Sequence, residues 1–312
     1  MPSTPPTTPP SPALPAAPRG VAVVSRFLAR YAYVPFMLLG LVGAAVWLVA
    51  ADAPKPWLLA VVVCAVGCSF AAERVLPYEP AWNSSLGDGR RDTAHAFVNE
   101  AFTLGGLAVI PVAAALAPAP QAWPDSWPLW CQVLLAVVAA DLGITLVHRA
   151  SHHVGWLWRL HAVHHSVKRC YGFNGLMKHP VHQTLETLGG VAPLVLLGLP
   201  LDVAYVLAVA VAVQLLLQHS NADYRTGPFT RILALNRGHR FHHLRWSGVG
   251  DVNFGLFTLI WDHAMRTFSY DPGRRFASED LGMAAKPDYP DAYLAQLTQP
   301  FRPDKPAAPT RP

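Results

Sequence analysis

Charged residues are scarce in this chain of 312 residues: only 14% are Asp, Glu, Lys or Arg, whereas 52% are hydrophobic. Soluble domains carry about 25% charged residues, so this composition is typical of a membrane protein. Cysteine is rare as well. Its four copies form no C-x-x-C pair and three of them lie in apolar runs, so we interpret them as small hydrophobic side chains without a disulfide framework.

Several short motifs are missing, and each absence excludes a class of protein. The chain has no H-E-x-x-H motif of the usual zinc proteases, no G-x-G-x-x-G between a strand and a helix, and no C-x-x-C-H for attaching haem. The net charge of +5 comes from basic residues spread along loops beside apolar segments. This distribution favours membrane topology over a nucleic-acid-binding patch, so we expect no nucleic-acid partner.

The sequence does contain long apolar runs, and a helix needs about 20 mostly apolar residues to cross a bilayer. The longest run is interrupted by Gly198, Pro200 and Asp202, which predicts a helical hairpin. Residues 254–261 are too few to cross and are expected to be interfacial or buried. We predict an all-α fold, a polytopic membrane helical bundle with a cytoplasmic histidine-rich metal-binding cap. The predicted membrane segments are Val34–Ala51, Trp57–Ala72, Phe102–Ala117, Leu129–Val147 and the two halves of Leu188–Gln218.

The positions of Lys and Arg give this bundle a direction. If the N-terminus is cytoplasmic, the outer loops lie near residues 52–56, 118–128 and 198–202, and Lys55 is then the only one of 24 Lys and Arg residues outside. Lys and Arg favour cytoplasmic loops. We therefore expect an integral, multi-pass membrane protein with its N-terminus, C-terminus and histidine clusters in the cytoplasm. The alternative is a soluble protein in which the short runs are buried helices.

Composition divides the chain into four predicted parts. Residues 1–30 are expected to be a disordered cytoplasmic tail, because the first 18 are rich in Pro, Ala, Ser and Thr. Residues 31–128 would hold the N-terminal transmembrane helices. Residues 129–270 would form a histidine-motif domain, and residues 271–312 a polar C-terminal tail.

Histidine is unusually concentrated: twelve of the 14 copies fall between His148 and His243, most of them in three short clusters. On a helix, residues three and four positions apart share a face, so each cluster can aim two or three imidazoles at one point. Neutral imidazole suits iron, zinc or copper, and three clusters offer enough nitrogens for two ions. A single histidine is more often a core or surface residue, but packing gives no reason to repeat this spacing three times. The clusters are His148–His152–His153, His161–His164–His165 and His239–His242–His243.

Two further histidines flank the predicted hairpin. His179 precedes it and His219 follows it, so both are expected at the same membrane face as the clusters. This location makes them additional candidate ligands. His182, which also precedes the hairpin, is a less favoured candidate.

Polar residues near the clusters are candidates for supporting the ligands. Asp141 lies two turns before His148 on one helix face, where it could orient a ligand through the second imidazole nitrogen, or pair with an Arg or a helix end. Asp251 and Asn253 follow the third cluster and could either support ligands or cap the next segment. The full set of candidate supporting residues is Asp141, His153, Asn221, Asp251 and Asn253.

In order, spacing and flanking residues, these motifs resemble the fatty acid hydroxylase/sterol desaturase superfamily, closely over residues 130–270. The matching motifs are Asp141 with His148-Arg-x-x-His-His153, Leu157-Trp-Arg-Leu-His161-x-Val-His-His-Ser166, His179-Pro180, His219-Ser-Asn221, His239-Arg-Phe-His-His243, Asp251-x-Asn-Phe-Gly255 and Trp261-Asp262. One departure follows the last motif. The family often reads Trp-Asp-Arg-x-Phe-Gly-Thr, whereas this chain reads Trp261-Asp-His-Ala-Met-Arg-Thr267, which affects local loop geometry more than the metal site.

The resemblance implies an integral membrane oxygenase that depends on metal, usually two iron ions (Fe2+/Fe3+), and uses O2 as co-substrate. Zinc is a possible alternative metal. Electrons would come from a separate redox partner, such as a ferredoxin, a cytochrome b5-like protein or a reductase. By the same resemblance, metal-ligand roles fall on His148, His152, His161, His164, His165, His239, His242 and His243, followed by His179 and His219. It implies no catalytic residue beyond these ligands.

We therefore expect a membrane-bound non-haem di-iron oxygenase that hydroxylates or desaturates a lipid C–H bond. Sterols, fatty acyl chains, ether lipids and carotenoids are all compatible substrates, and the sequence does not separate hydroxylation from desaturation. The alternative is a non-redox, zinc-dependent membrane protein, either a hydrolase or a metal carrier. A zinc protease would show H-E-x-x-H, and a carrier would need ligands across the membrane rather than at one face.

Overall fold

The structure, a computed structural model, describes residues 19–116 and 122–303. Within these residues the chain is helical and forms no extended strand, only two isolated bridges. The predicted all-α fold is confirmed. The α-helices are α1 (Arg19–Tyr31), α2 (Tyr33–Pro35), α3 (Val42–Ala50), α4 (Pro56–Val75), α5 (Gly89–Leu116), α6 (Leu129–His153), α7 (Gly155–His165), α8 (Pro180–Leu196), α9 (Leu201–His219), α10 (Asn236–His242), α11 (Ile260–Met265) and α12 (Tyr293–Thr298). The remaining turns of helix are η1 (Phe36–Leu41), η2 (Pro80–Asn83), η3 (Gly172–Leu176), η4 (Gly227–Arg231), η5 (Ser278–Asp280) and η6 (Gln299–Phe301).

Within residues 19–116 and 122–303, five segments are long and apolar enough to cross a membrane, as expected of a polytopic membrane protein. A helical hairpin forms where it was predicted, but its first half, α8, is not among these five segments. Helix α8 ends at Leu196, Gly198 adopts a left-handed conformation with φ of 92°, and α9 begins at Leu201. Glycine adopts this conformation without steric cost. The five segments are Tyr33–Ala50, Pro56–Val75, Gly89–Val112, Leu129–His153 and Leu201–His219.

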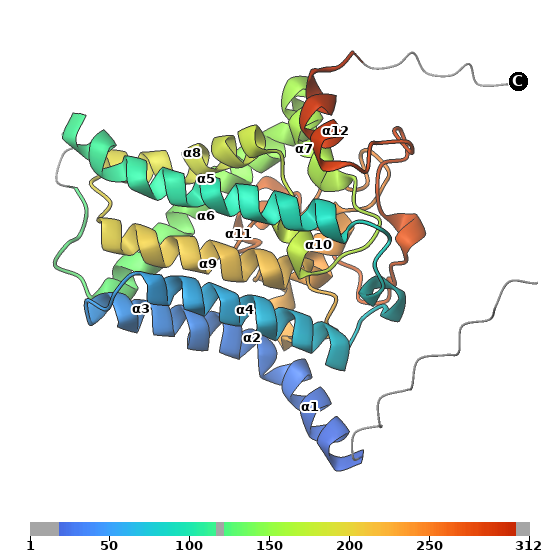
Figure 1. Ribbon diagram of the computed structural model, residues 1–312, viewed down its shortest axis with the longest axis horizontal. Coiled ribbons are helices and arrows are strands. Elements are labelled where there is room, and N and C mark those ends of the chain that lie inside the picture. The colour runs from blue at the N-terminus through green and yellow to red at the C-terminus, as the bar shows by residue number, and fades with distance from the viewer. Residues whose placement is uncertain (1–18, 117–121, 304–312) are drawn as a thin grey trace, which may run out of the picture.

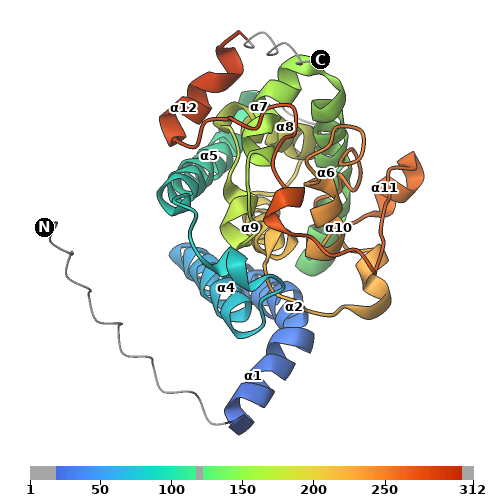
Figure 2. The ribbon, with the colours of Figure 1, turned by 90° about the vertical axis from the view of Figure 1, so that its right-hand side faces the viewer.

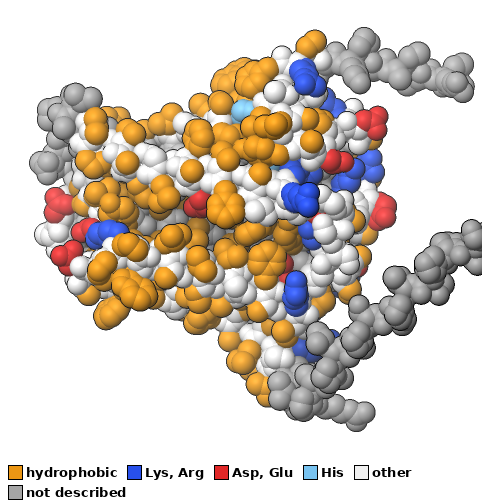
Figure 3. Space-filling model, viewed as in Figure 1, with side chains coloured by type: hydrophobic (Ala, Val, Ile, Leu, Met, Phe, Trp, Pro, Cys, Tyr) orange, Lys and Arg blue, Asp and Glu red, His pale blue; other side chains and the backbone are white. Residues whose placement is uncertain are grey.

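The long helices lie side by side, and several short helices gather at one end of the bundle. Figure 1 shows α3, α4, α5, α6, α8 and α9 running along the long axis, with α7, α10 and α12 at one end and α11 nearer the middle. Figure 2 looks onto that end. In Figure 3 apolar side chains cover the middle of the visible face, and charged side chains gather towards the two ends. This distribution is that of a bundle with an apolar belt and one enlarged polar end.

Helix α5 starts well before the apolar run predicted from Phe102, because its first half carries polar side chains that are buried. Asn99 donates hydrogen bonds of 2.7 and 3.0 Å to the backbone carbonyls of Leu176 and Lys178. His95 contacts the Lys178 carbonyl and the side chain of Gln296. These polar residues lie in a helix and bind other segments of the protein. Because they are polar, a hydropathy pattern alone does not assign them to a membrane helix.

Helices α6 and α8 approach each other through glycine. A Cβ atom placed on Gly143 of α6 would lie 2.0 Å from the carbonyl oxygen of Gly189 on α8. Small residues at such contacts let the backbones of membrane helices come together. The close approach places Ser151 of α6 beside His182 of α8, with 2.8 Å between Oγ and Nε2. It therefore fixes the position of α8 relative to the histidine-bearing end of α6.

The structure differs from the predicted terminal segments. The part of the expected N-terminal tail at residues 1–18 lies outside the described residues, but residues 19–30 belong to helix α1, which extends from the bundle (Figure 1). The predicted polar C-terminal tail is folded up to residue 303. Its buried residues Phe276, Met283 and Gln296 pack against the rest of the protein. The four cysteines are free, in agreement with the expected absence of disulfides.

Candidate metal centre

Histidines from four helices converge on two points at the end of the bundle that carries α7 and α10. We define site A as five histidines, and site B as four, whose ligand nitrogens lie within 4.8 Å of one another in each set. All are buried or nearly so. Site A consists of His148, His152, His161, His165 and His242. Site B consists of His164, His219, His239 and His243.

Each H-x-x-H-H motif contributes to both sites. On α7, His161 and His165 are one helical turn apart and point to site A, whereas His164 belongs to site B. The motif that begins in α10 does the reverse: His239 and His243 belong to site B and His242 to site A. The spacing explains this, because residues four apart share a face while adjacent residues diverge by about 100°. Helices α6 and α9 then complete site A and site B respectively.

Hydrogen bonds fix which ring nitrogen carries the proton in two histidines of site A. A carbonyl oxygen can only accept, so His148 must donate from Nδ1 to the Phe254 carbonyl at 2.8 Å, and His242 from Nδ1 to the Val252 carbonyl at 2.9 Å. In the neutral imidazole, Nε2 then carries a lone pair. The Nε2 atoms of His148 and His242 nevertheless lie 2.9 Å apart. Two lone pairs at this distance repel unless a cation lies between them, so the arrangement fits a metal ion.

Site B repeats this arrangement. His164 donates from Nδ1 to the Met177 carbonyl at 3.0 Å, and His219 from Nδ1 to the Leu215 carbonyl at 3.2 Å. Their Nε2 atoms, which both carry lone pairs, are 3.2 Å apart. The Nε2 atoms of His239 and His243 are 3.0 Å from each other as well. Both sites therefore present unprotonated nitrogens that converge on one point.

Burial keeps these imidazoles neutral. Loss of water around the ring lowers the pKa of His161, His164 and His242 well below 6.5, and neighbouring imidazoles lower it further. The pKa of His243 falls to about 3 for the same main reason, burial. A neutral imidazole is the form that binds a metal. The electrostatics thus prepare the site for a cation at any ordinary pH.

One of the five predicted supporting residues, Asp251, forms a hydrogen bond to a histidine of site A. His152 donates from Nδ1 to the Asp251 carboxylate at 2.8 Å, which leaves its Nε2 facing site A with no other partner. Metal-bound histidines commonly have such a carboxylate on the outer nitrogen. The hydrogen bond from His152 is also the main reason that the pKa of Asp251 is lowered.

Among the described residues, the other four candidate supporting residues form no hydrogen bond to a histidine of either site. Asp141 accepts hydrogen bonds from residues 256–258 and so anchors the loop after the third cluster rather than orienting a histidine directly. Asn253, at φ of 55°, ties the same loop to the carbonyls of Gly238 and Ser269. Asn221 binds Glu79 and Asn83. The fourth, His153, is exposed. The partners of Asp141 and Asn221 are more than 100 residues away in the sequence, which is why the sequence does not reveal them.

The structure does not bring His179 into either site. Its Nδ1 accepts a hydrogen bond from the backbone N–H of Val181, which caps helix α8, and its Nε2 contacts the Leu297 carbonyl. His182, the less favoured candidate, points towards site A. It forms a third group with His161 and Glu186, in which the possible ligand atoms lie within 4.8 Å of one another. Pro180 explains the difference, since it starts the helix and leaves the preceding residue as its cap.

Sequence reasoning missed three residues beside the histidines. Glu186 is one turn after His182 on the same helix face, so this spacing could have indicated it. Its carboxylate pairs with Lys178, and both side chains are buried. Trp158 packs its ring centroid 5.2 Å from that of His152 and 5.3 Å from that of His165, and so covers site A.

Comparison with known proteins adds independent information. A family model described as fatty acid hydroxylase matches residues 133–267, which contain every histidine of both sites. An ornithine lipid hydroxylase (OlsE) of Rhizobium tropici is 36% identical over 258 residues, covering 78% of this chain and 76% of the relative. Alkylglycerol monooxygenases of Danio rerio and Caenorhabditis elegans are 32% and 26% identical over 47% of this chain, and 32% and 28% of their own lengths. No solved structure matches the chain.

These relatives are named as enzymes that introduce oxygen into lipids, which makes the chain an oxidoreductase of lipids. The match to the ornithine lipid hydroxylase extends over most of both proteins, beyond the histidine motifs alone. The expected resemblance is confirmed by the family model as well. The chain belongs to the fatty acid hydroxylase family of membrane lipid oxygenases.

Proposed function

We propose that the protein is an iron-dependent lipid hydroxylase that holds two iron ions, one in site A and one in site B. The observation that carries this proposal is the convergence of lone-pair nitrogens, of which His148 and His242 with Nε2 atoms 2.9 Å apart are the clearest case. The proposed ligands are the five histidines of site A and the four of site B. His179 is not part of this set, because both of its ring nitrogens contact the backbone.

In site A, the spacing and the number of the nitrogens favour iron over a tetrahedral zinc ion. Nitrogens at about 2.1 Å from one ion are about 3.0 Å apart when they meet at a right angle, and about 3.4 Å apart at the tetrahedral angle. In site A the Nε2 contacts of His148, His161 and His165 measure 3.0 to 3.1 Å. Five histidines around one point also exceed the four ligands of a tetrahedral site. Zinc in a non-redox hydrolase or carrier is thus the less favoured alternative.

The proposed reaction inserts one oxygen atom of O2 into a C–H bond of a lipid. The C–H bond breaks and a C–O bond forms, and the second oxygen atom leaves as water after uptake of two electrons and two protons. Bound iron would supply the activation of O2. The protein's own residues hold the nitrogens in place, exclude water with the Trp158 ring and orient the lipid. Hydroxylation is favoured over desaturation because the relatives are named as a hydroxylase and monooxygenases.

We propose an aminolipid of the ornithine lipid type as the substrate, since that is what the most broadly matching relative described above is named for. The two electrons would come from a separate donor, such as a ferredoxin, a cytochrome b5-like protein or a reductase. We further propose that the sites, together with both ends of the chain, are cytoplasmic. Lys55, which pairs with Asp202, is the single Lys or Arg residue in the predicted outer loops at residues 52–56, 118–128 and 198–202.

Elemental analysis of the full-length protein, purified in detergent, tests the proposal most directly. We expect about two irons per chain in the wild-type protein and a loss of at least one in His164→Ala. Turnover of ornithine lipid should require both O2 and a reductant. Zinc without iron in active protein, or turnover undiminished without oxygen, would overturn the proposal in favour of the non-redox alternative.

A further inference from the structure

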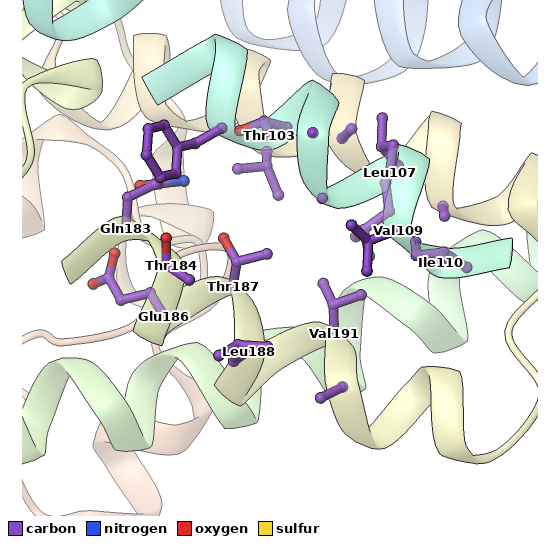
Figure 4. A pocket seen from close by; sticks show the side chains of 18 of the residues that line it. Thr103, Leu107, Val109, Ile110, Gln183, Thr184, Glu186, Thr187, Leu188 and Val191 are labelled. Atoms are coloured by element: carbon purple, nitrogen blue, oxygen red, sulfur yellow. The ribbon is translucent and has the colours of Figure 1, made fainter. Parts of the chain in front are cut away.

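A cavity of about 790 Å³ lies between α5, α8 and α9, and none of the histidines of sites A and B lines it. Its size is typical of pockets for small molecules. Most of the lining is apolar, and Figure 4 shows Leu107, Ile110 and Val191 towards one end. None of the proposed metal ligands lines this space, so its shape and polarity require a separate explanation.

The cavity opens sideways, towards the surface that faces lipid. Phe102 and Val109 of α5 and Leu188 of α8 line it and are themselves half exposed or more. Phe102 and Val109 belong to the segment Gly89–Val112, which is long and apolar enough to cross a membrane, and Figure 3 shows apolar side chains over the middle of the visible face. A molecule that enters between α5 and α8 therefore comes from the membrane, which selects a lipid over a water-soluble compound.

One end of the cavity is polar. Lys178, Gln183 and Glu186 line that end, and Figure 4 shows Gln183 and Glu186 apart from Ile110 and Val191. The Lys178 ammonium donates to the Glu186 carboxylate, with side chains that are 9% and 3% exposed. Buried charges are costly unless they are paired and fully hydrogen-bonded. Oxygen Oε1 of Glu186 is buried and has no hydrogen-bond partner among the residues that the structure describes, so this end offers a vacant acceptor.

The polar end is also the end next to site A. His182 lies 3.8 Å from Glu186, measured from Nδ1 to Oε2, and its ring centroid is 4.5 Å from that of His161 in site A. The opposite end reaches Leu196, which lies about 15 Å beyond Glu186 along α8 at 1.5 Å per residue. A lipid in the cavity thus has one end beside the histidines and the other far from them.

We propose that this cavity holds the tail of a membrane lipid whose polar headgroup lies against Lys178 and Glu186, so that the oxidised carbon belongs to the headgroup or to the carbons next to it. The opposite orientation would bury a polar headgroup among apolar side chains, which is costly. The inference rests on the proposed lipid hydroxylase function and specifies which part of the substrate reacts.

The charges at the polar end select a zwitterionic headgroup. An ammonium of the lipid would donate to the vacant oxygen of Glu186, while an oxygen of the lipid would accept from Lys178. A headgroup without charge would leave that vacant oxygen without a partner, which costs binding energy. An amino-acid headgroup with a free amine and a free carboxylate has both of the required groups.

Filling the cavity tests where the tail lies. Gly106 lines the cavity, and a Cβ at this position would meet nothing within 4 Å, so Gly106→Leu can project into the cavity without a backbone clash. Gly67 on α4 has equally open surroundings but does not line the cavity, so Gly67→Leu is the matched control. Native mass spectrometry of the full chain with added ornithine lipid should show about tenfold weaker binding for Gly106→Leu only. Equal binding by both variants would overturn the placement.

Removing both charges tests the headgroup. The double variant Lys178→Met/Glu186→Gln leaves neither charge unpaired, which protects the fold better than a single change. We expect the wild type to bind ornithine lipid at least tenfold more tightly than diacylglycerol with the same tails, and the double variant to bind the two equally. A preference that survives in the double variant would overturn the headgroup contact. Thermal unfolding shows whether the double variant is folded. The comparison of Gly106→Leu with Gly67→Leu tests the position of the lipid tail independently.

The position of the new oxygen separates this inference from the function on which it rests. Tandem mass spectrometry of the product should place the oxygen on the headgroup or on the carbons adjoining it. Oxygen in the far half of a tail would overturn the inference while supporting the hydroxylase function. A protein that binds ornithine lipid as predicted but oxidises no lipid would refute the proposed function instead.

Discussion

The carboxylate of Asp141 on α6 accepts a hydrogen bond of 2.7 Å from the hydroxyl of Thr258, which lies 117 positions later in the chain. Three backbone N–H groups of residues 256–258 donate to the same carboxylate at 2.8 to 3.0 Å. The carbonyl of Phe254, a few residues earlier, accepts from His148. One carboxylate thus fixes the loop that in turn fixes the proton position of a proposed metal ligand.

Replacing Asp141 by Asn should therefore lower both stability and metal content. The amide NH2 would face N–H donors, which removes at least one hydrogen bond and leaves its partner unsatisfied at a cost of about 1–3 kcal/mol. We expect a lower unfolding temperature and less iron in Asp141→Asn. Asp202→Asn is the control, because Asp202 is exposed and pairs with Lys55 at the opposite end. Identical unfolding of the two variants would contradict this account.

Two single substitutions distinguish a ligand from a helix cap. His239→Ala removes a nitrogen of site B and should abolish at least one bound iron. His179→Ala removes the cap of α8 and should cost about 1 kcal/mol of stability while both irons stay bound. Iron content by elemental analysis and thermal unfolding, measured on the same samples, separate the two effects. Loss of iron in His179→Ala would restore that residue as a candidate ligand.

The contact between α6 and α8 should tolerate no side chain. In Gly143→Ala the new Cβ would lie 2.0 Å from the Gly189 carbonyl oxygen, so the two backbones must move apart. Overpacking of this kind costs about 1–3 kcal/mol or more. Gly105→Ala, where the Cβ meets nothing within 4 Å, should unfold like the wild type or slightly later. Thermal unfolding in detergent measures both, and equal destabilisation would argue against the close contact.

Acid should destabilise the metal-free protein. Burial lowers the pKa of His243 to about 3 and that of His164 well below 6.5 in the folded state, whereas unfolded histidine binds a proton near pH 6.5. As the pH falls below about 6.5, the unfolded state takes up protons first, so the free energy of unfolding drops by about 1.4 kcal/mol per pH unit for each such histidine. Above that pH both states are neutral and the contribution is constant. Denaturant unfolding of chelator-treated protein across this range measures it, and stability that increases on acidification would contradict the prediction.

The sequence predicts the helical bundle, and it predicts that all three histidine clusters contribute candidate metal ligands. Both predictions depend on local patterns. Apolar length predicts a spanning helix, and the H-x-x-H-H spacing places His161 and His165 on one face. The division between two sites is not predictable in this way. His164 and His165 are neighbours in the chain yet face different sites, and which site each joins depends on how α7 packs against α9 and α10.

Features that depend on long-range contacts are the ones that the sequence concealed. The choice between His179 and His182 follows from Pro180, which makes the first residue a cap and turns the second inwards. The partners of Asp141 lie more than a hundred residues away. The C-terminal segment reads as a polar tail, but Gln296 is buried and contacts His95 across most of the length of the chain.

The exchange of histidines between α7 and α10 has a consequence for how the protein acquires its metal. Because His164 and His165 are adjacent, an ion that orders one of them also restrains the other, and the same holds for His242 and His243. On the proposed ligand set, filling either site prepares the second, so uptake of the two ions is cooperative. Cells short of iron would then contain a mixture of empty and fully loaded molecules, with few that carry a single ion.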